Sequence, residues 1–294
     1  MKVARINHKE FGETYGLISP DTNKVITKIE IQEQTGIPIP QNIKEFLFGN
    51  WIKEVKKYEE KLNFSLNIRK VELLAPLSNP NKIICLAFNY HDHAKDAGLT
   101  PSQEPVIFLK PRTALNSPFN DILCPANVQR LDYEAEIAVV IGSITKKIHE
   151  IQAMDSVFGY MIFHDVSARD IQFKDKQFTR GKSIDTFAPC GPWITTKEEI
   201  DDPQNLRIIT KVNEEIRQNS SSSKMVIPIS KIISSLSQLI TLEPGDIIST
   251  GTPAGVAMSM NDPRYLKHGD IVEINIEKLG TIKNKINFIE KVTL

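Results

Sequence analysis

LDYEAEIAVVIG (residues 131–142) and GYMIFHDVSARDIQ (residues 159–172) are the segments that say most about the fold and chemistry of this chain. In the first, Glu134 and Glu136 precede the apolar run Ile137–Ile141, which predicts a strand that becomes buried. Residues i and i+2 of a strand point to the same face, about 7 Å apart. Two carboxylates there are costly unless a cation or hydrogen-bond donors receive them. The segment therefore predicts a site for a hard metal ion.

Composition limits the classes of partner. The chain has 294 residues, enough for one large domain or two of unequal size. Its 36 basic and 36 acidic residues cancel, so we expect neither nucleic acid nor a membrane as a partner. We find no signal peptide and no long apolar stretch, and the three cysteines are isolated. These features predict a cytoplasmic protein without a disulfide framework or zinc site.

The pattern along the chain predicts a strand-dominated, mixed α/β fold with two parts. Residues 1–71 alternate short strand-like runs with a helix-like stretch over residues 43–62, and we expect a small, variable α+β domain there. Residues 72–294 are rich in short apolar runs separated by Gly, Pro, Asn and Asp, which predicts a catalytic domain built mainly of strands.

Six motifs of the second part support a resemblance to a known family: KIICLAFNYHDHAKDAG (82–98), VIFLKP (106–111), DYEAEIAVVIG (132–142), GYMIFHDVSARDIQ (159–172), GKSIDTFAPCGPWI (181–194) and LEPGDIISTGTPAGV (242–256). In type and order they resemble the fumarylacetoacetate hydrolase family over roughly residues 72–290. The resemblance implies a mixed β-sandwich roll, a divalent cation, a homodimer and a small α-keto or enol acid as substrate.

The metal ligands implied by the resemblance are Glu134, Glu136 and Asp165. Carboxylates with water suit Mg²⁺, with Mn²⁺ or Ca²⁺ as alternatives, because these ions prefer oxygen ligands. An α-keto acid can complete such a site, where the metal acts as a Lewis acid on the keto oxygen.

The resemblance places the catalytic histidine at His93 and its acidic partner three residues later, at Asp96. If Asp92 begins a short helix, the two side chains share one face. A carboxylate on an imidazole raises its basicity, which suits a base that activates water. The resemblance implies that family hydrolases usually have Glu at the second position, and here the side chain is one methylene shorter.

Other candidate residues follow from the same motifs. Lys182 resembles the family's active-site lysine and, with Gln172, is expected to stabilise an oxyanion. Arg169 either contacts substrate or pairs with Asp170 or another buried acid. Three further residues are candidates for substrate binding. Thr252 offers its hydroxyl, and Lys110 either lines the pocket or neutralises nearby acids. Tyr90 either contacts the distal end of the substrate or belongs to the core.

These residues predict a metal-dependent hydrolase that cleaves a C–C bond in an acylpyruvate-like substrate through a metal-stabilised enolate, as in aromatic catabolism. The alternative on the same site is a 2-hydroxyhepta-2,4-diene-1,7-dioate isomerase, or an oxo-acid decarboxylase or tautomerase, none of which needs a water-activating pair. An alternative of another class is a metal-binding pseudoenzyme.

Overall fold

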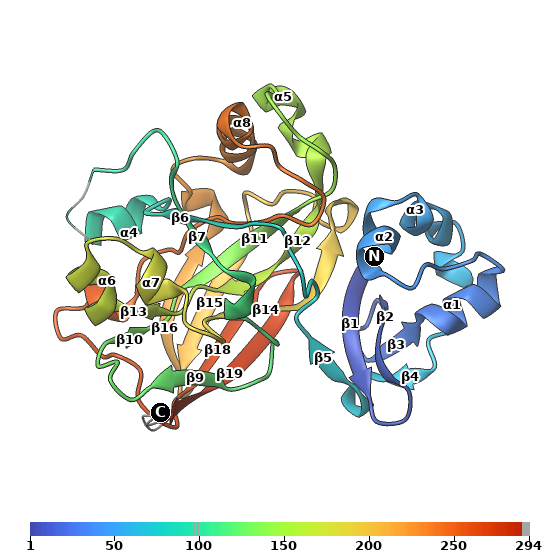
Figure 1. The fold of residues 1–294 in the computed structure, drawn as a ribbon, viewed down its shortest axis with the longest axis horizontal. Helices are drawn as coiled ribbons and strands as arrows, with labels where there is room; N and C mark the ends of the chain where they lie inside the picture. Colours follow the sequence, from blue (N-terminus) through green and yellow to red (C-terminus); the bar gives the residue numbers. More distant parts are fainter. Residues whose placement is uncertain (97, 99, 290–294) are drawn as a thin grey trace.

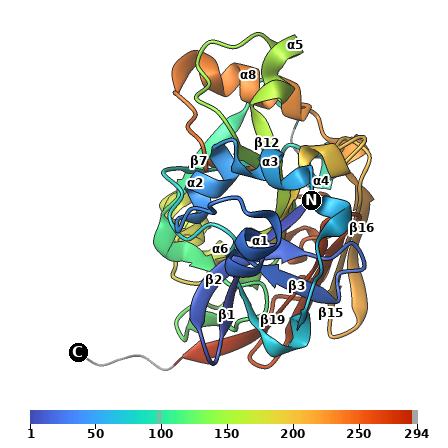
Figure 2. The same ribbon diagram turned by 90° about the vertical axis from the view of Figure 1, so that its right-hand side faces the viewer.

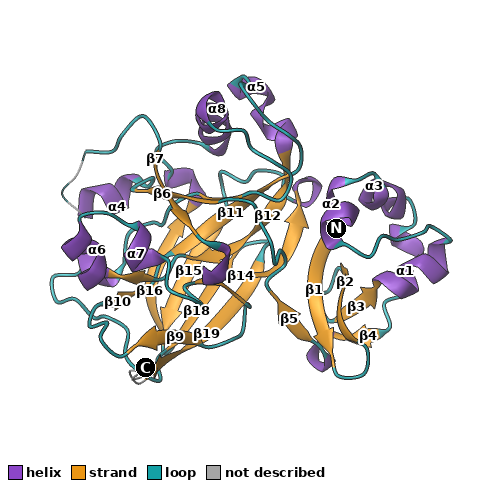
Figure 3. Ribbon diagram, in the orientation of Figure 1, coloured by secondary structure: helices purple, strands orange, loops and turns teal. Residues whose placement is uncertain are grey.

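The computed structural model describes residues 1–96, 98 and 100–289. A small N-terminal part lies beside a larger, strand-rich part (Figure 1). Figure 3 shows strands running through both parts, with helices gathered at the periphery. This arrangement confirms the prediction of a strand-dominated, mixed α/β fold. Among the described residues, no helix is long and apolar enough to cross a membrane.

The small part packs three helices against a short antiparallel sheet (Figure 2). Gly49 ends one helix, and its N–H donates to Glu45 O at 2.9 Å, so the stretch predicted as one helix over residues 43–62 is two. A 3₁₀ turn then replaces regular helix from Glu59. The elements are β1 (Lys2–His8), β2 (Gly12–Ile18), β3 (Lys24–Thr27), β4 (Leu66–Asn67), α1 (Lys28–Thr35), α2 (Ile43–Phe48) and α3 (Trp51–Lys56).

The described strands of the large part belong to three sheets: a long sheet shared with the small part, a five-stranded sheet and a two-stranded sheet. Its strands are β5 (Glu72–Leu74), β6 (Ile83–Ala87), β7 (Val106–Lys110), β8 (Leu115–Asn116), β9 (Ile122–Pro125), β10 (Leu131–Asp132), β11 (Ala135–Ile141), β12 (Val157–His164), β13 (Ser167–Ala168), β14 (Ala188–Thr196), β15 (Arg207–Val212), β16 (Glu215–Ser221), β17 (Ile247–Ser249), β18 (Ile271–Ile276) and β19 (Gly280–Ile289). Its helices are α4 (His91–Asp96), α5 (Glu150–Ala153), α6 (Arg169–Asp175), α7 (Thr179–Lys182) and α8 (Ile229–Leu239).

One long sheet joins the two parts. Its order is β4-β3-β2-β1-β14-β12-β11-β17-β6-β7, with β5 paired to β1 and β8 paired to β14. Lys2 and Val3 of β1 pair with Thr195 and Ile194 of β14, so the ladder continues across the junction. The boundary predicted after residue 71 remains a prediction.

Strand β11 lies at the centre of the molecule and is buried on both faces. Ile137, Val139 and Ile141 belong to one apolar core, which the five-stranded sheet β16-β15-β18-β19-β9 helps to enclose. Ala138 and Val140 belong to a second core, shared with the small part. Burial on both faces explains why the sequence of this strand is a continuous apolar run rather than an alternating one.

The register of β11 determines where its acidic residues lie. Ala135 pairs with His164 at the end of the antiparallel neighbour β12. Strand β17 pairs antiparallel with β11 and parallel with β6, so the carboxyl ends of β17 and β6 reach the same edge. The loops that follow β6, β12 and β17 therefore converge on the beginning of β11.

Candidate active site

The three predicted metal ligands lie together at this edge. Glu134 and Glu136 flank the first residue of β11, and Asp165 directly follows β12. The backbone N–H of Asp165 donates to the carbonyl of Glu134 at 3.0 Å, which fixes the two segments side by side. One carboxylate oxygen from each residue lies within 4.8 Å of the others, and all three residues are buried.

Two lysines contribute positive charge to this cluster. Lys182 Nζ lies 2.6 Å from a carboxylate oxygen of Glu134 and 2.6 Å from one of Asp165, and Lys110 Nζ lies 2.5 Å from the other oxygen of Asp165. Burial by itself would lower the pKa of Lys182, but the charges of Asp165 and Glu134 outweigh it and raise that pKa above its usual value. Lys182 is therefore a permanently charged hydrogen-bond donor in the site, and Lys110 neutralises an acid.

Glu134 and Glu136 differ in their surroundings. Burial would raise the pKa of Glu134, but Lys182 and Arg169 lower it well below its usual range. Glu136 accepts hydrogen bonds from Ser249 Oγ at 2.6 Å and the N–H of Gly251 at 2.9 Å, both of them neutral donors. Burial, then the charges of Asp165 and Glu134, raise the pKa of Glu136 well above its usual value.

The donor set fits a hard divalent cation. Glu134, Glu136, Asp165 and the neighbouring Asp132 are acidic, whereas the cations paired with them are Lys110, Arg169 and Lys182. Glu136 has no ion-pair partner among the described residues. A cluster of buried oxygen ligands with one carboxylate in excess is a suitable site for Mg²⁺ or a similar ion.

Arg169 at the start of α6 is held by acids from the neighbouring strands. Its Nε donates to Asp132 at 2.9 Å, its Nη2 to Glu134 at 2.5 Å, and its Nη1 to the side-chain oxygen of Gln172 at 3.1 Å. Asp170 instead accepts a bond from the backbone of Gln129. Arg169 therefore pairs with the buried acids Asp132 and Glu134 rather than with Asp170. It also orients the side chain of Gln172.

Asp132 also belongs to the site, although the sequence motifs did not predict it. This fully buried carboxylate accepts hydrogen bonds from Arg169 and from the backbone N–H groups of Ala257 and Met258, at 2.8 and 3.1 Å. It therefore joins α6 to the loop after β17. The signal was present, because Asp132, Glu134 and Glu136 alternate as D-x-E-x-E, which extends the two-residue period by one more acid.

His93 is buried in α4, and its Nδ1 has no hydrogen-bond partner in the described part of the chain. Asp92, rather than Asp96, anchors this helix: its carboxylate accepts bonds from Ala254 N–H at 3.3 Å and from Lys224 Nζ at 3.0 Å. Asp96 is exposed at the end of α4, and no hydrogen bond joins it to His93 among the described residues. The expected contact is therefore not formed here, and a catalytic role for Asp96 remains a prediction.

A small cavity of about 20 Å³ connects these groups. It is lined by seven of the predicted residues, His93, Glu134, Glu136, Arg169, Gln172, Lys182 and Thr252, together with Leu86, Ala87, Phe88, Phe108, Phe178 and Met258. The hydroxyl of Thr252 already donates to the carbonyl of Ala135 at 3.0 Å and accepts from Gln218 at 2.9 Å. Tyr90 is fully buried, outside the lining, with a hydroxyl that lacks a partner among the described residues.

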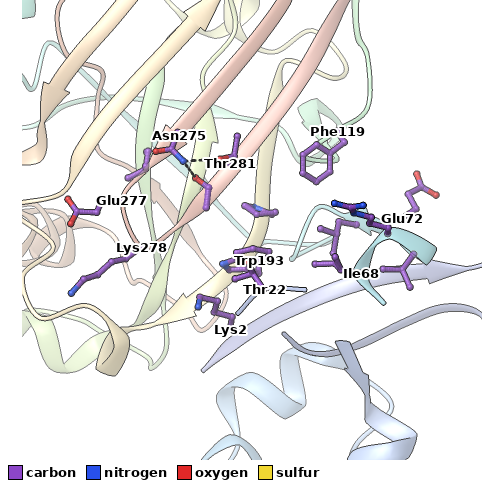
Figure 4. Close-up of a pocket in the computed structure, with 16 residues that line it drawn as sticks. Lys2, Thr22, Ile68, Glu72, Phe119, Trp193, Asn275, Glu277, Lys278 and Thr281 are labelled. Atoms are coloured by element: carbon purple, nitrogen blue, oxygen red, sulfur yellow. Dashed lines mark hydrogen bonds between the residues drawn. The ribbon is translucent and has the colours of Figure 1, made fainter. Parts of the chain in front are cut away.

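A larger cavity, of about 790 Å³, lies elsewhere, between the small part and the β18–β19 hairpin. Figure 4 shows Trp193, Ile68 and Phe119 around it with Lys2 and Lys278. None of the predicted catalytic, substrate-binding or metal-ligating residues lines it. Volume therefore does not identify the reactive site, whereas the convergence of buried charged groups does.

Buried carboxylates, ammonium groups and an imidazole around one cavity are characteristic of an enzyme site for a small anionic substrate. Residues 82–287 match the family description "Fumarylacetoacetate (FAA) hydrolase C-terminal". A mitochondrial oxaloacetate tautomerase from Bos taurus is 44% identical over 219 residues, which cover 74% of this chain and 70% of that protein. The chain belongs to the fumarylacetoacetate hydrolase family.

Solved structures agree with this assignment. The 2-hydroxyhepta-2,4-diene-1,7-dioate isomerase from Mycobacterium marinum is 35% identical, has a TM-score of 0.76 and is matched over 98% of both chains. The fumarylacetoacetate hydrolase from Exiguobacterium antarcticum is 32% identical, with a TM-score of 0.81 over 98% of this chain and 100% of that one. The fold and the family are therefore shown, and proteins of this family carry names for several different reactions.

The raised pKa of Glu136 predicts that Mg²⁺ binding is pH dependent. A proton must leave Glu136 before it can act as a ligand, so affinity should increase as pH rises above the ordinary pKa range of a glutamate, with a proton released on binding. Calorimetric titration in buffers of different ionisation enthalpy measures both quantities. Glu136→Gln should bind more weakly and lose this pH dependence, and equal affinity of the unaltered protein at all pH values would contradict the prediction.

Asp132→Asn should destabilise the protein by about 3 kcal/mol or more, because it leaves Arg169 buried without one of its two anionic partners. Urea denaturation followed by circular dichroism measures the change. The matched control is Asp175→Asn, which breaks the exposed pair with Arg180 and should leave the unfolding midpoint unchanged. Equal midpoints for the two variants would show that Asp132 does not support the site.

Proposed function

We propose that this protein is a divalent-metal-dependent tautomerase that interconverts the keto and enol forms of a small 2-oxo acid such as oxaloacetate. The observation that carries the proposal is the buried imidazole of His93, which lines the carboxylate cavity without a carboxylate partner in the described structure. Proton transfer next to a ketone requires one base and an oxyanion site, whereas hydrolysis also requires an activated water. The name of the bovine relative supports the same reaction.

Glu134, Glu136 and Asp165 would hold the metal, and Mg²⁺ is the ion that we propose. When bound, this ion supplies Lewis acidity toward the keto oxygen of the substrate. Lys182 is charged and lines the cavity, so its ammonium can donate a hydrogen bond to the oxygen on which negative charge develops. Gln172 lines the same cavity, and a hydrogen bond from Arg169 holds its side chain in place.

His93 is the proposed base. Burial lowers the pKa of its imidazole below the usual 6.5, and Glu134 only partly offsets this effect. The imidazole is therefore neutral near pH 7 and can accept the proton from the carbon next to the keto group. His93 then gives this proton to the enolate oxygen, so that one C–H bond breaks and one O–H bond forms with no net change in the enzyme.

A C–C bond hydrolase is the second candidate, and it is the function that the sequence analysis put first. The similarity to the hydrolase from Exiguobacterium antarcticum favours it. In this reaction His93 would activate water, with Asp96 as a partner only if α4 moved. An isomerase acting on 2-hydroxyhepta-2,4-diene-1,7-dioate, as the Mycobacterium marinum protein is named, would use the same oxyanion site.

Replacing His93 by alanine should abolish the Mg²⁺-dependent decay of oxaloacetate enol absorbance while Mg²⁺ binding persists, because His93 is not among the proposed ligands. In the unaltered protein saturated with Mg²⁺, kcat/KM should fall with decreasing pH only below about 6.5, since the pKa of the base is lowered. Stopped-flow absorbance measures the enol decay and kcat/KM. Undiminished enol decay in His93→Ala would exclude this residue as the base.

An acylpyruvate separates the two candidates. A tautomerase changes its enol absorbance without releasing pyruvate, which a coupled lactate dehydrogenase assay detects directly. Pyruvate formation that requires both Mg²⁺ and His93 would instead establish the hydrolase. Replacing Lys182 is unsuitable as a control, because this lysine pairs with two of the proposed metal ligands. The control is Asp96→Asn, which should slow hydrolysis but leave tautomerisation unchanged.

Other expectations remain proposals. We propose a homodimer and a role in aromatic catabolism on the basis of the family resemblance. A cytoplasmic location is proposed from the sequence, although the bovine relative is named as mitochondrial. Size-exclusion chromatography with light scattering tests the dimer.

A further inference from the structure

Phe88 separates the catalytic cavity from a second cavity that has no assigned role. Leu86, Ala87 and Phe88 line the catalytic cavity of about 20 Å³, and the same three residues line a neighbouring cavity of about 170 Å³. We call the second one the tail pocket; its other lining residues are Asn89, Thr100, Ser102, Glu104, Pro105, Val106 and Ile227. The end of β6 and the residue that follows it therefore lie between the two cavities.

The position of the Phe88 ring is defined by its backbone and its neighbours. Phe88 has φ +55°, in the left-handed region that bulky side chains rarely occupy. This backbone directs the ring onto His93, with ring centroids 5.5 Å apart and planes inclined by 21°. Phe178 meets the same ring edge-on at 6.3 Å. An unusual backbone that holds a side chain against the proposed base indicates a functional constraint.

The tail pocket has the chemistry of a site for an uncharged group. Among its described lining residues none is basic, so it offers no counter-ion to a second carboxylate. The amide of Asn89 is already bonded to both backbone groups of Ile227 and to the carbonyl of Thr250. The carboxylate of Glu104 accepts from Ser235. What remains for a ligand is mainly the apolar surface of Leu86, Val106 and Ile227.

We propose that Phe88 determines substrate length: its ring restricts the enzyme to short 2-oxo acids by closing the catalytic cavity to a pocket that would otherwise take an uncharged, apolar substrate tail. This inference rests on the proposed function for the identity of the 2-oxo acid head group. The head would occupy the carboxylate site, and the tail would leave it past the position of the Phe88 ring. Phe88 is a specificity-determining residue in this scheme and transfers no proton.

The test compares oxaloacetate with phenylpyruvate, a 2-oxo acid with an uncharged aromatic tail whose enol is also followed by absorbance. Phe88→Gly should raise the kcat/KM ratio of phenylpyruvate to oxaloacetate about tenfold or more, as expected for extra apolar groups admitted to a pocket. Glycine tolerates the left-handed backbone, and Phe88→Asn is a second variant because asparagine tolerates it too. Adding Val106→Trp, which fills the tail pocket, should reverse the gain. An unchanged ratio in both folded variants overturns the proposal.

Two further measurements separate this proposal from the proposed function. Phe178→Leu enlarges the catalytic cavity at a residue that does not line the tail pocket, so it should not give the tenfold change. Calorimetry of the Mg²⁺-loaded protein with phenylpyruvate and with 2-oxoadipate measures affinity, whether or not the acid is tautomerised. Phe88→Gly should improve the affinity for phenylpyruvate more than that for 2-oxoadipate, whose tail is charged. If no acid is tautomerised but this difference appears, the function fails and the role of Phe88 stands; equal changes for both acids overturn that role.

Discussion

The antiparallel pairing of β11 with β12 is the constraint on which the site depends. It places Ala135 opposite His164, and as a result two glutamates and one aspartate from separate segments share a buried space. Such a concentration of negative charge would oppose folding by itself. Lys110, Lys182 and Arg169 are drawn to it as counter-ions, and each arrives from a different element. The fold thus assembles the reactive groups in part because the carboxylates require partners.

The same balance of charges determines the protonation states of Glu136 and His93. The three cations offset three of the four neighbouring acids, and Glu136 keeps a raised pKa in the absence of a metal ion. A bound divalent ion would supply the missing charge, and its binding would be coupled to proton release. Burial acts in the opposite sense on the imidazole of His93, whose lowered pKa keeps it neutral. The same burial therefore favours the protonated form of Glu136 and the neutral form of His93.

Much of this could be predicted from the sequence, for reasons that differ between residues. The pairing of Glu134 with Glu136 followed from local strand geometry, whereas their grouping with Asp165 came from the family resemblance. The contact of Lys110 with Asp165 joins residues 55 positions apart, so the sequence left it as one of two alternatives. The exposure of Asp96 depends on how α4 is anchored through Asp92, a contact with the distant loop at Ala254. Asp132 was not predicted although it alternates with the glutamates, because its role depends on contacts with the distant residues Arg169 and Ala257.

The continuous ladder from β4 to β7 has a consequence for how the molecule unfolds. Because β1 is hydrogen-bonded to β14, and β14 to the strand that ends at Asp165, the small part cannot separate without breaking main-chain bonds. Substitutions that destabilise the small part would then also weaken the strands that position the carboxylates. Loss of the small part and loss of the site should accordingly form a single cooperative event, rather than the melting of two independent bodies.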